Sequence, residues 1–154
     1  MVQELNRDLI ARVTEQAKQS PRKRMNYNFH SGPNDNPHRF LNVMLKGTYV
    51  RPHRHLNPPK TEGFLALEGT GAVVTFDDHG NRTATYTIGQ DDRIGVDIPV
   101  GIWHTVLVTS DVLVCYEVKP GPWDPTSDKE FAEWAPEEGT PEAGTFLHSL
   151  LLAV

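Results

Sequence analysis

Apolar residues recur at helical spacing near the N-terminus of the chain. Across residues 2–19 most of them stand three or four positions apart, which places them on one side of a helix. The residue before a proline avoids the helical region, so the helix is expected to end at Ser20, before Pro21. The apolar positions are Val2, Leu5, Leu9, Ile10, Val13 and Ala17.

From residue 40 onward the pattern changes to short runs rich in Val, Ile, Thr, Tyr and Phe, bounded by Gly, Pro, Asn or Asp. Such runs are typical of β-strands, and residues 78–81 form a hairpin turn signal between two of them. Since no helical pattern lies between the runs, they predict a sandwich or barrel, best matched by an eight-stranded jelly roll. The predicted strands cover residues 40–46, 48–53, 62–69, 71–78, 82–89, 93–100, 104–110 and 111–119.

The stretch after Lys119 is rich in Pro, Trp and acidic residues and has little strand character. It predicts a short helix over residues 127–134, capped by Ser127 or Asp128, and a terminal helix over residues 145–154. The chain is therefore expected to be a mainly β protein with three parts. These are an N-terminal helix (1–20), a barrel (21–120) and a C-terminal extension packed on the barrel (121–154).

Composition narrows the class of protein. The chain has 154 residues, a net charge of −5 and a single cysteine. An acidic domain offers no electrostatic footprint for nucleic acid or an anionic membrane, and no run approaches the roughly 20 apolar residues of a membrane span. The N-terminus lacks the apolar core of a signal peptide, and Cys115 has no internal partner for a disulfide. We therefore expect a cytoplasmic protein that binds neither nucleic acid nor a membrane.

Three histidines and a glutamate stand in positions that favour a metal site. His53 and His55 are two apart, which on a strand puts both imidazoles on one face. Glu62 opens the next predicted strand, and His104 follows the tight turn made by Pro99 and Gly101. Imidazole suits Zn, Fe, Ni and Cu, and the carboxylate also allows Mn, so one divalent transition metal is expected, with Zn, Fe, Mn and Ni as the candidates.

A solvated surface is the competing interpretation of these histidines. The His-x-His pair alone is weak, but the glutamate, the flanking glycines and the downstream turn all fit one site. The remaining histidines have no such support. We expect His38, His79 and His148 at the surface, and His30 stays open as a pocket residue.

The order of these residues resembles the two motifs of the cupin superfamily. The first motif is Gly47, His53, His55, Glu62 and Gly69, and the second is Pro99, Gly101 and His104. The resemblance implies a double-stranded β-helix barrel in which the three histidines and Glu62 hold a metal. The chain departs from the motifs in the long gap between His55 and Glu62 and in ending the second motif on Val108 rather than Asn.

A narrower resemblance is to the WbuC-type cupin fold metalloproteins, which also have the long loop before the glutamate. The family occurs in bacterial surface-polysaccharide gene clusters and elsewhere, and it has no settled reaction. The resemblance therefore implies the fold and the metal but not the substrate, and it adds Arg24 and His30 as ligand contacts. The matching segments are residues 21–24, 30, 39–42, 49–55, 60–62, 99–105, 117–122 and 129–136.

Charged residues beside the apolar runs predict an anionic ligand. If Arg51, Lys60 and Arg39 ring the metal, they would attract a carboxylate or a phosphate. The alternative is a set of ordinary surface charges. Tyr49 and Trp103 are candidates for the pocket mouth, although such aromatics more often lie in a core.

Two classes of function remain open. The first is a metal-dependent enzyme for a small anionic or sugar-derived substrate, with Glu62 or Glu117 as base and with isomerase, epimerase and oxygenase chemistry all compatible. The second is a non-catalytic module that binds a small ligand or metal. In either case we expect a homodimer, because the N-terminal helix and the apolar tail can cover barrel edges.

Overall fold

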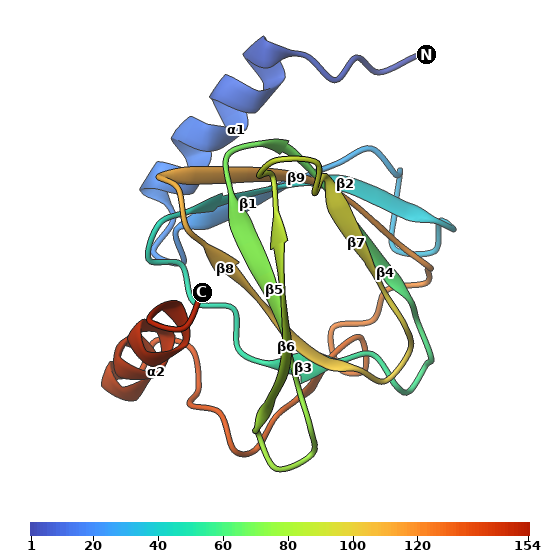
Figure 1. Ribbon diagram of the computed structural model, residues 1–154. Coiled ribbons are helices and arrows are strands. Elements are labelled where there is room, and N and C mark those ends of the chain that lie inside the picture. The colour runs from blue at the N-terminus through green and yellow to red at the C-terminus, as the bar shows by residue number, and fades with distance from the viewer.

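Two five-stranded antiparallel sheets pack face to face in the computed structural model, which describes residues 1–154 (Figure 1). This arrangement confirms the predicted jelly-roll barrel. The first sheet has the order β1 (Arg24–Asn28), β2 (His38–Leu45), β9 (Val112–Lys119), β4 (Glu62–Glu68) and β7 (Gly95–Ile98). The second has the order β10 (Glu130–Phe131), β3 (His53–Arg54), β8 (Trp103–Val108), β5 (Gly71–Phe76) and β6 (Arg82–Ile88).

The N-terminal helix α1 (Arg7–Gln19) covers the outer face of the first sheet (Figure 1). It begins five residues later than predicted because the side chain of Asn6 caps it, accepting a hydrogen bond from the Leu9 N–H at 3.0 Å. Val2 and Leu5 therefore lie outside the helix and are exposed. The buried contacts join Leu9, Ile10, Val13 and Ala17 to Leu41, Val43 and Val114.

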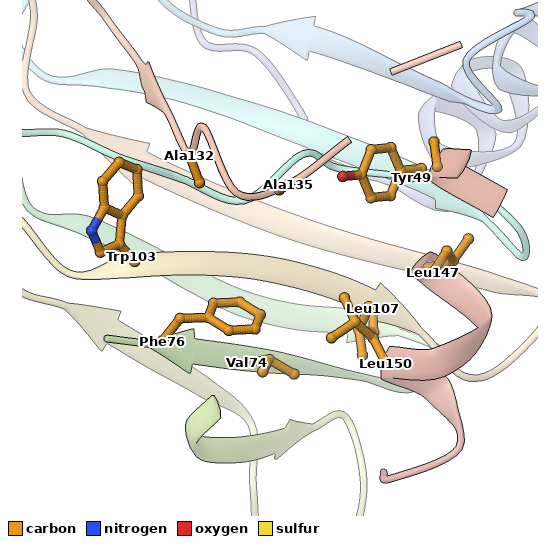
Figure 2. Close-up of a cluster of buried hydrophobic side chains, with 10 residues drawn as sticks. Tyr49, Val74, Phe76, Trp103, Leu107, Ala132, Ala135, Leu147 and Leu150 are labelled. Carbon is orange, nitrogen blue, oxygen red and sulfur yellow. The ribbon is translucent and has the colours of Figure 1, made fainter. Parts of the chain in front are cut away.

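The C-terminal helix α2 (Pro141–Leu151) covers the outer face of the second sheet. It begins at Pro141 rather than at residue 145, since proline is well suited to the first helical turn. Figure 2 shows Leu147 and Leu150 over Leu107 and Val74, next to Tyr49. Neither α1 nor α2 has the length and the apolar content of a membrane-spanning helix.

Strand β8 is buried along its whole length, because α2 covers one face of its sheet and the first sheet covers the other. Trp103 and Leu107 point outward into the core beneath α2. Val106 and Val108 point inward into the core between the sheets. His104 shares the inward face, because alternate residues of a strand point to the same side.

The interior of the barrel changes from apolar to polar along its strands. On the inner face of β9, Leu113 and Cys115 belong to the apolar core, whereas Glu117 and Lys119 line a cavity. On the antiparallel neighbour β2, Met44 belongs to the same core and the earlier residues line the cavity. One end of the barrel is therefore a polar chamber.

Three local predictions were wrong. The run at residues 48–53 contributes only the start of β3, because Tyr49 turns outward and donates a hydrogen bond to the carbonyl of Pro136 at 2.8 Å. Strand β1 was missed because its side chains are mostly polar. Residues 127–134 are not a helix, since Glu130 and Phe131 pair with β3.

Candidate metal centre

His53, His55, Glu62 and His104 meet at the polar end of the barrel. One ligand atom from each lies within 4.8 Å of all the others, and all four residues are buried. β3 and β8 place His53 directly opposite His104. Gly101, whose positive φ of 78° suits glycine, donates its N–H to the His55 carbonyl and so joins the turn before β8 to this group.

Backbone carbonyls fix the orientation of all three imidazoles. The Nδ1 of His53 lies 2.9 Å from the Arg51 carbonyl oxygen, and that of His104 lies 2.9 Å from the Ile102 carbonyl oxygen. The Nδ1 of His55 contacts the carbonyl of Asp128. Because a carbonyl only accepts hydrogen bonds, each Nδ1 carries a proton and each Nε2 is left for the centre of the group.

The group therefore needs a cation at its centre. The Nε2 of His104 lies 3.0 Å, and that of His55 3.4 Å, from the same carboxylate oxygen of Glu62. An Nε2 lone pair repels a carboxylate unless a proton or a metal ion lies between them. The His55 Nε2 is also buried without a hydrogen-bond partner. Imidazoles held at Nδ1 with free Nε2 atoms are the usual arrangement of metal ligands, so the residues fit a divalent transition metal.

Two buried glutamates beside this centre titrate in opposite directions. Burial raises the pKa of Glu117 well above its ordinary value, and the nearby charge of Glu62 raises it further. Burial also acts to raise the pKa of Glu62, but its contacts with His104 and His55 and the charge of Lys119 outweigh it, and the pKa of Glu62 falls well below its ordinary value. Glu62 therefore loses its proton more readily than Glu117 does. The Glu117 carboxyl also accepts a hydrogen bond from Asn42 at 3.0 Å.

Asp128 connects the metal group to two buried lysines. Its carboxylate lies 3.0 Å from the ammonium of Lys60 and 3.0 Å from that of Lys119. Lys119 also lies 3.5 Å from the Glu62 carboxylate. Sequence reasoning missed Asp128 and Lys119, because nothing in their local pattern separates them from surface charges.

A cavity of about 620 Å³ is lined by Lys119 and Asp128, which contact this group, and also by Arg24 and His30, which were predicted as ligand contacts. His38 was expected at the surface, but it is buried, because it starts β2 on the inner face and its Nε2 donates to the Pro33 carbonyl at 3.0 Å. His30 and His38 stack with ring centroids 4.0 Å apart. Lys129, also missed, lines the same cavity.

The remaining predicted ligand contacts lie outside the cavity. Arg51 donates to the Ala132 carbonyl at 2.9 Å and lies over the ring of Phe131. Arg39 shares the outward face of β2 with Leu41. Lys60 is held in the Asp128 network, while Tyr49 and Trp103 belong to the core beneath α2.

Comparisons with known proteins agree with this architecture. A family model described as a domain of unknown function (DUF6016) matches residues 5–88. The capsular polysaccharide assembling protein CapF from Staphylococcus aureus is similar in structure, with a TM-score of 0.59 and 25% identity over 70% of this chain, which spans only 31% of CapF. No curated protein matches the chain.

Two further solved structures cover more of their own length. A protein from Shewanella oneidensis has a TM-score of 0.60 and 13% identity, and the match covers 98% of this chain and 95% of that one. A cupin 2 conserved barrel domain protein from Rhodopseudomonas palustris has a TM-score of 0.51 and 16% identity over 70% of this chain and 66% of its own. The cupin fold is thereby confirmed, whereas the narrower WbuC assignment stays a prediction.

Proposed function

The chain belongs to the DUF6016 family, and on that premise we propose that it is a metal-dependent enzyme of the WbuC type. Its substrate is a small anionic or sugar-derived molecule. The observation that carries the proposal is the convergence of three carbonyl-held imidazoles and an ionised carboxylate on one point beside a cavity. Such a set gains from a cation and is costly without one.

The metal would be held by His53, His55, Glu62 and His104 and would be Zn, Fe, Mn or Ni. When bound, it supplies a Lewis acid that polarises an oxygen of the ligand. Without the metal, the carboxylate of Glu62 would be buried against the lone pairs of the imidazoles. Protons therefore compete with the metal for the same ligand atoms, and metal affinity should rise with pH.

Glu117 is the residue best placed to move a proton. It lines the cavity, whereas the Glu62 carboxylate contacts the imidazoles of His104 and His55. Its raised pKa favours the protonated carboxyl, and Asn42 fixes the orientation of that carboxyl. A carboxyl of this kind serves as a general acid, and after losing its proton as a general base.

The similarity to CapF supports a sugar-derived substrate. CapF is described as assembling capsular polysaccharide, and it has been crystallised with the inhibitor 3-isopropenyl-tropolone. A tropolone presents adjacent carbonyl and hydroxyl oxygens, which is a metal-chelating arrangement. It is therefore a useful probe for this chain, whose own reaction is proposed independently of the larger protein.

The proposal extends to assembly and location. We infer a cytoplasmic homodimer, and the exposed apolar side chains of Leu65 in β4 and of Ile94 just before β7, 48% and 68% accessible, support an interface there. Light scattering at micromolar concentration tests the dimer. A monomeric mass would contradict this part of the proposal.

The deciding experiment is metal analysis of protein purified without chelator or added metal. We expect close to one equivalent of transition metal in the wild type and in His79→Ala, a matched control because His79 is exposed in a turn. His53→Ala should lose the metal, and 3-isopropenyl-tropolone should bind only to the metal-loaded protein. Equal metal contents in both variants would overturn the site. A ligand that binds but is never altered would favour the non-catalytic module.

A further inference from the structure

The positive charges around the cavity differ in whether they have partners. Arg22 and Arg24 both pair with Glu138, at 2.9 and 2.8 Å. Lys60 and Lys119 share the carboxylate of Asp128, as described above. The ammonium of Lys129 makes no hydrogen bond and no ion pair, although the residue is partly buried and lines the cavity.

The register of β10 explains why Lys129 faces the cavity. In the antiparallel pair of β10 with β3, Phe131 lies opposite His53 and Glu130 lies opposite Arg54. Glu130 and Arg54 form an ion pair at 2.7 Å on the outer side. Alternation therefore places Lys129, one residue earlier, on the side that carries the metal-ligating histidines. Consistent with this, the charge of Lys129 helps to lower the pKa of His53, after burial.

Lys129 has no carboxylate partner of its own, because Asp128 pairs with Lys60 and Lys119 and Glu62 belongs to the metal group. Lys60, Lys119 and Lys129 face at most three negative charges, those of Glu62, Glu117 and Asp128. A divalent metal then adds two positive charges that nothing in the chain neutralises. Burial, and next the charge of Lys119, lower the pKa of Lys129. An anion beside Lys129 would reduce the free-energy cost of this charge, because a buried ammonium is costly without a partner.

The opposite wall of the cavity is suited to hydroxyl groups. The Nδ1 of His30 lies 3.1 Å from both the N–H and the carbonyl oxygen of Arg39, so its Nε2 is left without a partner and can donate or accept according to the tautomer. His38 donates from Nε2 to the Pro33 carbonyl, so its Nδ1 is a free acceptor. The Asn42 Oδ1 is buried without a partner. Donors and acceptors in such a mixture match hydroxyl groups, each of which both donates and accepts.

We propose that Lys129 is the anion anchor of this cavity and that the ligand is a hydroxylated carbon chain bearing one carboxylate or phosphate group. The inference rests on the proposed function, because the anion lies beside the metal that the histidines hold. It replaces the predicted ring of Arg51, Lys60 and Arg39 by a single residue. A charge-assisted hydrogen bond to a buried ammonium should contribute about 10- to 100-fold in affinity.

The test uses three probes with the same carbon skeleton: sorbitol, gluconate and sorbitol 6-phosphate. Titration calorimetry on the metal-loaded wild type should show one of the two anions binding at least about 10-fold more tightly than sorbitol, and which anion it is distinguishes carboxylate from phosphate. Lys129→Gln should remove this advantage, and Lys129→Arg should restore it. Lys46→Gln is the matched control, since Lys46 is exposed just after β2.

Several outcomes would overturn the inference. Undiminished anion binding by Lys129→Gln would exclude Lys129 as the anchor, provided its thermal unfolding matches the wild type. Equal affinity for sorbitol and the anions, or no millimolar binding of either anion, would exclude the ligand class. Repeating the titrations on chelator-treated protein separates the two proposals. If His53→Ala retains its metal while the effect of Lys129 persists, the metal site is wrong and the anchor stands.

Discussion

Replacing Glu62 with glutamine separates the two roles of its carboxylate, because glutamine has the same shape but carries no charge. In the metal-free protein its amide can donate to the Nε2 atoms of His104 and His55, now 3.0 and 3.4 Å away. These neutral hydrogen bonds contribute about 0.5–1.5 kcal/mol each and replace charge-assisted bonds of about 1.5–3 kcal/mol. Glutamine also removes the desolvation penalty of a buried carboxylate, which amounts to several kcal/mol.

These effects oppose each other, so the free energy of unfolding of the metal-free variant should lie within about 1 kcal/mol of the wild type. The metal-loaded proteins should differ far more. At free metal about 100-fold above Kd, the wild type gains about 2.7 kcal/mol. For a domain of this size that is a rise in Tm of about 5–11 °C. Glu62→Gln should lose most of it, because a neutral amide oxygen is a weak ligand.

Thermal unfolding followed by circular dichroism, with chelator and with ZnCl2, measures both quantities. Glu117→Gln is the matched control, because Glu117 is equally buried but lies outside the ligand group. It should keep the metal-dependent rise in Tm. A Glu62→Gln variant that keeps the full rise, or that loses more than about 3 kcal/mol without metal, would refute the position of the cation.

The remaining predictions concern the parts that support the site. Arg22 and Arg24 lower the pKa of Glu138 to about 2, against the opposing effect of burial, so Glu138→Gln should cost about 1–2 kcal/mol at pH 7 after allowance for solvent screening. This contribution is present above the unfolded pKa of 4.5 and is lost as pH falls toward 2, so urea unfolding at pH 7 and pH 2.5 should show the difference shrinking. Leu147→Ala should cost about 2–5 kcal/mol by calorimetry, because this residue of α2 is only 7% exposed and packs against the second sheet. Cys115 should resist a thiol reagent at pH 8 until the protein unfolds, because burial raises its pKa to about 12.

Each of these has a contrasting result. A loss from Glu138→Gln that is equal at both pH values would remove the ion pair as its cause. Leu152→Ala, at a position 75% exposed, is the control for Leu147 and should be nearly neutral. Rapid labelling of folded Cys115 would show that the core between the sheets opens readily.

The ligand group could be predicted because its signals are local. His53 and His55 are two residues apart, and the turn at Gly101 precedes His104 by three residues. Strand alternation and turn geometry then suffice to bring them to one face. Glu62 could be predicted because it opens the next predicted strand along the chain.

The rest of the cavity depends on contacts between distant segments. Asp128 lies 68 residues from Lys60 and 73 from His55 in sequence, and only the pairing of β10 with β3 brings them together. The stretch at residues 127–134 was predicted as a helix because its local composition permits one. Pairing of β10 with β3 outweighs that weak local preference. Because a helix was predicted there, the side to which Lys129 points could not be predicted.

For two residues that were predicted as ligand contacts, strand alternation in the sequence already indicated an outward position. Arg39 alternates in phase with Leu41 and Val43, which are the residues that α1 covers. Trp103 is one residue from His104 on a strand and must face the other way. The apolar pattern shows which residues share a face, but for a strand buried on both sides it does not show which face is inward.

Strand β8 illustrates a consequence for mutational tolerance. Its six residues have no solvent-facing side, since one side belongs to the chamber and the sheet core and the other to the packing beneath α2. Random substitution should therefore find almost no neutral position there, whereas β6, with several accessible side chains, should accept many changes. The sequence of the C-terminal helix is constrained as well, because its buried side chains pack against β8. A change in that packing would displace the strand that carries His104.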